Sequence, residues 1–409
     1  MIILYAIPVF MLLIVLEALV DWRKTTGYYR FNDAVGSLST GMLNRTMDFV
    51  TLYVNWAAYS ALFAYFSFFQ LEQSPIIWIV AFIVYDFFYY WSHRLDHVFS
   101  IFWNAHAVHH QSEEFNLTTA LRQPFSGFVK GSLVYMPMVF LGFNPALVAV
   151  VGSFNLIYQF WVHTRFVPKL GFVEWIMVTP SNHRVHHGMN DRYIDKNFGG
   201  VFILWDRLFG TFQEELPDDP VVFGVRKPLN SFNPFYANFQ IYGQMLKDMW
   251  VGRSLRTTIE ILISRTGVRP SIVNERAPMP RLNMQNFHPY NPNCSMSGRW
   301  QVWSQLLFAL GYTVWFLLSV DLQNFTVALL HFFPLGLVLL SMNFILEGRP
   351  LGWWIEAFRL SYILLISVWV PVLWPENISV LYSIAAGIYW GFCFYFQKRN
   401  FTVISESNT

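Results

Sequence analysis

The chain has 409 residues, of which 55% are hydrophobic, 19% are aromatic and only 13% are charged. A soluble protein of this length needs more charge to cover its surface, so the composition excludes an ordinary soluble enzyme and indicates a membrane protein. The net charge of +2 shows no basic excess for nucleic-acid binding, and two cysteines, Cys294 and Cys393, are too few for a disulfide framework or a thiolate-rich metal site.

Five apolar segments precede a long polar stretch at about 164–298, and a membrane-spanning helix needs about 20 mostly apolar residues. The first segment lacks a basic start and a small-residue cleavage site, so a retained membrane helix is expected, with a signal peptide as the alternative. The second is longer than one span needs, which allows either a tilted or a broken helix. The last two, joined at Phe143-Asn144-Pro145, form a tight pair that allows a hairpin crossing the membrane only in part. The five segments are 2–20, 37–66, 75–92, 127–143 and 145–163.

Four further apolar segments follow the polar stretch, and together the nine predict an orientation. Nearly all Lys and Arg lie on one side of such a topology, and the turns on the other side, near 67–74, 142–146, 320–322 and 374–376, contain neither residue. Positive residues favour the cytoplasmic side, so the polar stretch and the C-terminus are expected to be cytoplasmic. The fold class predicted is all-α, a polytopic membrane bundle with a cytoplasmic cap and four additional C-terminal helices, at 300–319, 323–343, 351–373 and 377–396.

Nine of the 11 histidines lie at or just past the predicted cytoplasmic helix ends, mostly three or four residues apart, which puts their rings on shared helical faces. A single histidine is usually a surface residue, but three spaced groups on one side of a membrane indicate metal binding. Nine neutral imidazoles are too many for one ion and suit two redox-capable metals, which favours iron and O2 chemistry. The predicted ligands are His93, His97, His106, His109, His110, His163, His183, His186 and His187.

Five polar residues near these histidines are candidates for supporting roles. Asp86 lies two helical turns before His93 in an apolar segment, where an acidic residue is costly and usually has a partner. We expect it to hold a ligand histidine in one tautomer, with a solvated interfacial Asp as the alternative. Asp195 and Asn197 are candidates for the same role beside the third histidine group. Asn116 and Arg122 are candidates for contact with a lipid headgroup or with the ligands, the alternative for Arg122 being an interfacial anchor.

Three histidine boxes, HRLDH (93–97), HAVHH (106–110) and HRVHH (183–187), resemble the signature of the membrane fatty acid hydroxylase and sterol desaturase superfamily. The surrounding segments YYWSHR, HHQSEEFNLTTALRQ, LIYQFWVHT and TPSNHRVHHGMNDRYIDKNFGGVFILWDRLFGTF resemble its alkylglycerol monooxygenase branch. The resemblance extends over about 75–240, and Gln159 stands where some members have a tenth histidine.

This resemblance implies a catalytic membrane domain at 1–298, with the cap at 164–298, and a C-terminal extension at 299–409. It implies two iron ions held by the nine histidines, although zinc also suits an all-imidazole site. It further implies O2 as co-substrate, tetrahydrobiopterin as reductant and cleavage of the ether bond of alkylglycerol lipids. The bacterial inner membrane and the endoplasmic reticulum both agree with the charge asymmetry.

Two other functions remain open at this point. One is a sterol or fatty-acyl hydroxylase or desaturase, which would take electrons from a partner protein. The other is a membrane metal-binding or transport protein without redox chemistry. Transport favours ligands near the middle of the bilayer, whereas these histidines are predicted at helix ends.

Overall fold

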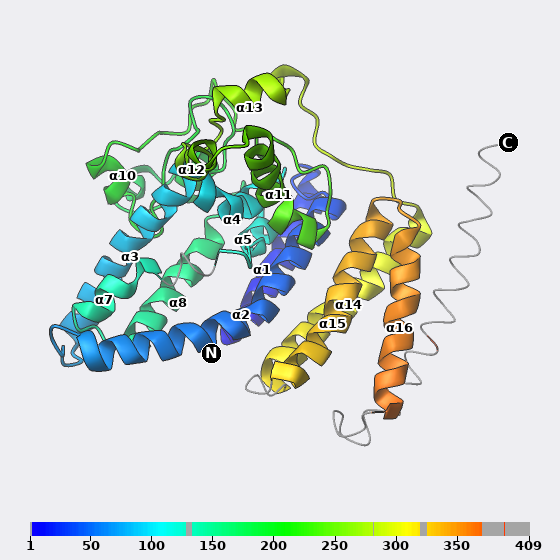
Figure 1. Ribbon diagram of the computed structural model, residues 1–409, viewed down its shortest axis with the longest axis horizontal. Helices are drawn as coiled ribbons and strands as arrows, with labels where there is room; N and C mark the ends of the chain where they lie inside the picture. Colours follow the sequence, from blue (N-terminus) through cyan, green and yellow to red (C-terminus); the bar gives the residue numbers. More distant parts are fainter. Residues whose placement is uncertain (1, 128–132, 281, 320–324, 370–387, 389–409) are drawn as a thin grey trace. The chain divides into compact units, whose positions relative to one another are not determined.

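The computed structural model describes residues 2–127, 133–280, 282–319, 325–369 and 388. Within these ranges the regular structure is helical, with isolated bridges in place of strands, so the all-α prediction is confirmed (Figure 1). The chain divides into two compact units. The first comprises Met1–Asn230 and Tyr236–Pro289, and the second comprises Ser231–Phe235 and Tyr290–Thr409.

Four described helices are long and apolar enough to cross a membrane: Ile2–Lys24, Pro75–Val98, Met296–Leu318 and Thr326–Leu346. They lie in four of the nine predicted segments, and the chain is an integral membrane protein. The predicted ninth segment, 377–396, lies outside the described residues apart from position 388.

The long helices of the first unit are α1 (Ile2–Lys24), α2 (Phe31–Phe66), α3 (Pro75–Val98) and α8 (Pro145–Trp161), and α8 packs against the other three. The α3 helix begins sharply because Ser74 accepts a hydrogen bond from the Ile77 amide and Pro75 occupies the first helical position. The α2 helix is unbroken over 36 residues, which excludes the broken alternative for that segment.

The apolar segment 127–143 does not form one spanning helix in its described part. It contains the short helix α7 (Met136–Phe140), which starts around Pro137 and ends before Gly142 at φ +92°. Proline favours a helix start and cannot continue a preceding one, and a positive φ ends it. Asn144 then caps α8 by accepting from the Ala146 amide, so α7 and α8 are joined by a tight turn, and a hairpin that crosses the membrane only in part stays a prediction.

The first unit also carries short elements between and after the long helices. They are α4 (Ser100–His110), α5 (Leu117–Leu121), η1 (Gly171–Trp175), α9 (Pro180–His186), α10 (Leu204–Leu208), α11 (Pro234–Gly252), α12 (Leu255–Ile263), α13 (Ser271–Arg276) and η2 (Met284–Asn286). Within this set α4 packs against the end of α3 and α5 packs against α1, α2 and α8. The contact between α3 and α4 brings the first two histidine boxes together.

The second unit contains α14 (Met296–Ser319), α15 (Phe325–Leu346) and α16 (Leu351–Trp369), with α15 packed against both neighbours. Its interior combines apolar side chains with several buried polar ones, among them Gln305, Ser341 and Asn343. In α16 the Arg359 guanidinium donates to the Glu356 carboxylate at 2.6 and 2.9 Å, and both side chains are buried. A buried charge needs such a partner, and each of these two side chains supplies it for the other.

Candidate metal centre

The nine predicted histidines converge into two groups of ring nitrogens, and within each group the nitrogens lie within 4.8 Å of one another. The first histidine group consists of His93, His97, His106, His110 and His186. The second histidine group consists of His109, His163, His183 and His187. The remaining two histidines, His288 and His331, belong to neither group.

Helical spacing explains which histidine joins which group. His93 and His97 are four apart on α3, and His106 and His110 are four apart on α4, so each pair shares a face turned toward the other. His109 is one residue before His110, and a rotation of about 100° per residue turns it toward the second group.

The α9 helix divides its histidines in the same way. Thr179 and Asn182 form a reciprocal capping box and Pro180 takes the first position, so this helix of seven residues has a defined start. His183 and His187, four apart, join the second group, whereas His186 joins the first. The α9 helix therefore connects the two groups.

Burial favours the neutral form of seven of the nine rings. Burial lowers the pKa of His109 to about 4, because desolvation disfavours the imidazolium and outweighs the hydrogen bond to a carbonyl. Burial first, and then the neighbouring rings, lower the pKa well below its usual value for His106, His110, His163, His183, His186 and His187. Neutral imidazoles present a lone pair, which is the form that binds a metal ion.

Backbone carbonyls determine the tautomer of four rings. The Nδ1 atoms of His93, His109, His163 and His186 lie 2.8–3.0 Å from the carbonyl oxygens of Phe198, Arg122, Gln159 and Lys196. A carbonyl only accepts, so each Nδ1 carries the proton and each Nε2 keeps its lone pair.

Two of these lone pairs point at one another. Nε2 of His109 and Nε2 of His163 are 3.1 Å apart although both rings hold their proton on Nδ1. Two lone pairs cannot form a hydrogen bond, and a shared cation relieves the repulsion. In the described chain the buried Nε2 atoms of His97, His186 and His187 also have no hydrogen-bond partner. The donor set thus fits metal ions in both groups.

The loop Asp195–Phe198 supports three histidines of the first group. Asp195 Oδ1 lies 3.6 Å from His97 Nδ1, and the carbonyls of Lys196 and Phe198 accept from His186 and His93. Asp195 and Asn197 have φ of +58° and +55°, a conformation that Asp and Asn adopt more readily than most residues. The positive φ angles of Asp195 and Asn197 alternate with the intervening backbone, and the carbonyls of Lys196 and Phe198 therefore both face the first histidine group.

The prediction that Asn197 orients a histidine through its side chain is wrong. Its Nδ2 donates to the carbonyls of Asn182 and Gln213 at 2.9 and 2.8 Å, and its Oδ1 accepts from the Gln213 amide at 2.8 Å. These bonds use the whole amide, so Asn197 fastens the loop to α9 instead. Asp195 does contact a histidine, but that histidine is in the first box and not the third.

The prediction that Asp86 holds a histidine tautomer is also wrong. Its carboxylate is fully buried and accepts four hydrogen bonds of 2.7–3.0 Å, none of which comes from a histidine in the described chain. A Cβ on Gly200 would lie 2.9 Å from Asp86 Oδ1, so glycine is required for this close approach. Asp86 anchors the chain that follows the third box to α3 and α8, through Asn155, Val201, Phe202 and Trp205.

Asn116 and Arg122 are buried, so their predicted contact with a headgroup is wrong. Asn116 caps α5 by accepting from Thr118 and donates to the Tyr28 carbonyl at 2.8 Å. Arg122 donates from Nε to the Val108 carbonyl at 2.7 Å, which satisfies the end of α4. Arg122 supports the centre through its own carbonyl, which accepts from His109.

Sequence reasoning missed Asp206, which braces the loop Asp195–Phe198 from behind. Its buried carboxylate accepts from the amides of Phe198 and Gly199 and from the Thr211 hydroxyl, each at 2.7 Å. Burial raises its pKa to about 6, and these hydrogen bonds oppose the rise. A signal was present, because WDRLFGT follows the third box and contains this one acid.

Glu17 was missed as well. It is buried on α1 and accepts from Tyr29 Oη at 2.5 Å, from the Leu117 amide at 2.8 Å and from the Thr164 hydroxyl. Thr164 follows His163, so Glu17 ties the first spanning helix to the turn that carries this histidine. It is the one acid in the apolar part of the first segment, and such residues usually have a structural or functional partner.

Comparison with known proteins gives a consistent result. Residues 78–211 match the family model described as fatty acid hydroxylase. The chain is 36% identical over 368 residues to the alkylglycerol monooxygenase of Danio rerio, covering 88% of this chain and 81% of that protein. It is 34% identical to the human alkylglycerol monooxygenase, covering 87% and 80%. It is 28% identical to the ornithine lipid hydroxylase OlsE of Rhizobium tropici, covering 47% and 59%. No solved structure matches.

Proposed function

Because the chain belongs to the alkylglycerol monooxygenase family, and so is a lipid monooxygenase, we propose that it cleaves the ether bond of alkylglycerol lipids. The carbon next to the ether oxygen gains a hydroxyl group from O2, and the resulting hemiacetal separates into an aldehyde and a glycerol lipid. A reduced pterin supplies the two electrons that reduce the second oxygen atom to water. The relatives' names and their coverage of most of the chain support this substrate.

We further propose that two iron ions occupy the centre, one held by each histidine group. The observation that carries this proposal is the opposed pair of lone pairs on His109 and His163, which a metal ion satisfies. Bound iron would supply O2 activation, and zinc would occupy the same imidazoles without that chemistry. Two groups joined through α9 suit a pair of ions better than one.

The chain's own residues prepare the site in three ways. Burial lowers the pKa of His109 and of six neighbouring imidazoles and so favours their neutral form. Carbonyls of Phe198, Arg122 and Gln159 hold the Nδ1 protons, so the Nε2 atoms keep a fixed direction. The surrounding cap limits the access of water to the reacting carbon.

The position along the helices suits a lipid. His93 and His97 lie in the last turns of α3, which is long and apolar enough to span the membrane. A lipid tail can then stay in the bilayer while the carbon beside the ether oxygen reaches the histidines. We place this end of α3 and the C-terminus on the cytoplasmic side, as the distribution of Lys and Arg favours. Residues 1–298 would form the catalytic domain and 299–409 an extension.

Product analysis tests the reaction. The purified protein, loaded with Fe(II), would be incubated with 1-O-hexadecylglycerol, O2 and a reduced pterin, and hexadecanal would be measured. Formation of the aldehyde supports ether cleavage. If no aldehyde forms, while a sterol or fatty-acyl lipid is oxidised with a reductase protein as electron donor, the alkylglycerol assignment is wrong.

A further inference from the structure

The exposed face of the membrane span α3 ends where another part of the chain covers it. Ile79 and Ile83 are exposed along one face of this helix, and Phe87 continues the same face one turn later. The rings of Trp205 and Phe209 lie 5.3 and 6.4 Å from the Phe87 ring. The short helix α10 and the residue after it therefore pack on the face of α3 that is otherwise open to lipid (Figure 1).

These contacts lie within the apolar part of α3. The ring of Phe202, which precedes α10, lies 6.2 Å from the ring of Phe82. With a rise of about 1.5 Å per residue, Phe82 and Phe87 lie about 10 and 18 Å along the helix from Pro75, within the roughly 30 Å of hydrocarbon that a span crosses. A segment that touches these positions lies at the depth of the acyl chains.

A second segment, which contains η1, pairs with the chain before α10. The Ile203 amide donates to the Ile176 carbonyl at 3.0 Å, and the Val178 amide donates to the Val201 carbonyl at 2.8 Å. Tyr158 of α8 donates to the Val178 carbonyl at 2.7 Å, so α8 contacts this structure as well. We call residues 170–178 and 199–209 together the paired segments.

The backbone of the paired segments has the partners that membrane depth requires. Besides the hydrogen bonds between the two segments, the amides of Val201 and Phe202 donate to the Asp86 carboxylate at 2.8 and 3.0 Å. The Trp205 indole donates to the same carboxylate at 2.9 Å. Non-helical backbone is tolerated in a membrane only where the protein supplies such partners, because the acyl chains offer none. Asp86 thus satisfies donors that lipid would leave unpaired.

The outer surface of the paired segments is apolar. Leu204 and Leu208 are four apart on α10 and both are exposed, Leu208 by 70%. On η1, Phe172 and Trp175 are 80% and 65% exposed, and the neighbouring Ile176 is exposed too. We call these five side chains the apolar patch. Large apolar side chains gathered in this way on a protein surface indicate contact with a partner or with a membrane.

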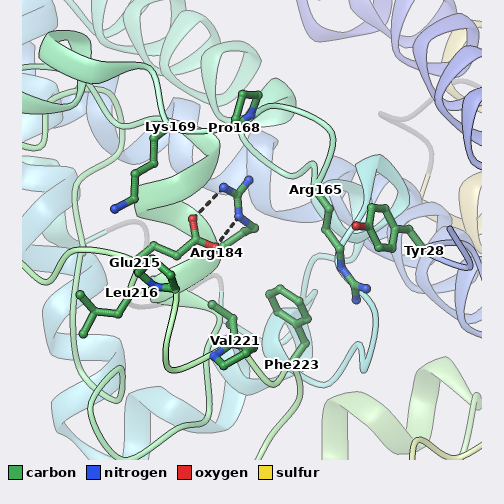
Figure 2. Close-up of a pocket in the computed structure, with 11 residues that line it drawn as sticks. Tyr28, Arg165, Pro168, Lys169, Arg184, Glu215, Leu216, Val221 and Phe223 are labelled. Carbon is green, nitrogen blue, oxygen red and sulfur yellow. Dashed lines mark hydrogen bonds and ion pairs between the residues drawn. The ribbon is translucent and has the colours of Figure 1, made fainter.

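Basic side chains border the apolar patch. Lys169 lies three residues before Phe172, and Figure 2 shows it with Arg165 and Arg184 on the wall of one cavity in the first unit. Within α10, the Arg207 guanidinium lies 4.7 Å from the Trp175 ring. Basic and aromatic residues concentrate where a protein meets lipid headgroups, and long basic side chains extend toward water. This border is the one expected between headgroups and acyl chains.

We propose that the apolar patch is inserted among the acyl chains of the leaflet at the histidine end of α3. Lipid is the occupant because the paired segments cover the exposed face of α3 and lie at the depth of its apolar part. The insertion also bears on the metal centre. Asp206 of α10 accepts from the Phe198 amide, and the Phe198 carbonyl accepts from His93. One piece of chain therefore joins the lipid contact to the first histidine group.

The test is fluorescence quenching of the full-length protein in phosphatidylcholine nanodiscs. A single cysteine carries an environment-sensitive label in a background with Cys294→Ser and Cys393→Ser. The tested positions are Leu208→Cys and Phe172→Cys. Ile79→Cys, on the exposed face of α3, is the lipid reference, and Asp218→Cys, in an exposed polar loop, is the water reference.

Two quenchers separate the environments: phosphatidylcholine brominated on its acyl chains, and iodide in the aqueous phase. Metal content and thermal midpoint confirm that each labelled variant is folded. We expect the labels at 208 and 172 to be quenched by the brominated lipid at least about threefold more strongly than the label at 218, and nearly as strongly as the label at 79. Iodide should give the opposite order.

Two results overturn the inference. Iodide quenching at 208 and 172 equal to that at 218, without quenching by bromine, places the apolar patch in water. Protection of both labels from both quenchers shows that protein covers the patch, either a second copy of this chain or another partner. Because the two tested positions lie on different segments, distortion of the chain by one label does not decide the outcome.

Discussion

Nε2 of His109 and Nε2 of His163 lie 3.1 Å apart, and both rings donate their Nδ1 protons to backbone carbonyls. The two lone pairs have no proton to share, so the pair is stable only with a cation or with an altered tautomer. This relationship connects the carbonyl hydrogen bonds, which are structural, to the chemistry that the centre can support.

Removing one histidine from either group should lower the metal content of that group alone. We expect His109→Ala and His186→Ala each to reduce the bound metal from about two ions per chain to about one. The measurement is elemental analysis of purified protein. His288→Ala changes an exposed histidine outside both groups and should keep the full content. Unchanged metal content in both group variants would show that these rings are not ligands.

Asn197 offers a test of the loop that supports the first histidine group. Asn197→Ala removes three hydrogen bonds and puts alanine, which tolerates the left-handed region less well than asparagine, at positive φ, at a cost of about 1 kcal/mol in addition. Asn197→Gly removes the same hydrogen bonds without the strain. Both variants should weaken metal binding by roughly 10–100-fold. Only Asn197→Ala should show the additional loss of stability. Wild-type metal affinity in both variants would show that the loop Asp195–Phe198 does not support metal binding.

Asp86 should be essential for folding around the third box. Asp86→Ala leaves four buried donors without an acceptor, and each such group costs about 1–3 kcal/mol. We expect a lower thermal midpoint in detergent and loss of bound metal. Asp191→Ala is the control, because this side chain is 93% exposed and makes one ion pair. A midpoint for Asp86→Ala equal to that of the control would contradict the anchoring role.

The metal-free protein should lose stability as the pH falls. The pKa of His109 is about 4 when folded and about 6.5 when unfolded, so the unfolded chain binds more protons between these values. Its contribution is therefore complete above about pH 6.5 and is lost toward pH 4. His109 alone should cost about 2 kcal/mol between pH 7 and pH 5. Denaturation of the metal-free protein at the two pH values measures this, and His109→Asn should show a smaller difference.

Removing one partner of the α16 ion pair should destabilise the protein more than replacing both partners. Arg359→Met leaves the Glu356 carboxylate buried without its partner, at a cost of about 3–5 kcal/mol. Replacing both, as Glu356→Gln with Arg359→Met, should recover much of that loss. Thermal midpoints in detergent measure the difference. A double variant less stable than Arg359→Met would show that the carboxylate has another essential role.

Several features of the fold could be predicted from local pattern. Apolar segments of sufficient length predicted α1, α3, α14 and α15, because each contains enough apolar residues to cross a bilayer. At 127–143 the described part forms no single long helix, which agrees with the hairpin alternative. Pro137 and Gly142 divide that segment, and average hydrophobicity does not register where a backbone breaks.

The candidate site shows the same limit. Spacing of three and four along helices was enough to predict that the histidines gather, since helical geometry alone puts such rings on shared faces. It could not predict that His109 and His110, adjacent in the chain, join different groups. That division depends on how α4, α8 and α9 meet.

The sequence by itself predicted an all-helical membrane chain with nine histidines spaced for metal binding. Only the tertiary structure decided the partners of the buried polar groups. Asp86 binds backbone 115 residues away and Glu17 reaches a threonine 147 residues away. Burial requires each such group to find a partner, but which one it finds depends on the packing of distant helices, and local spacing carries no information about that.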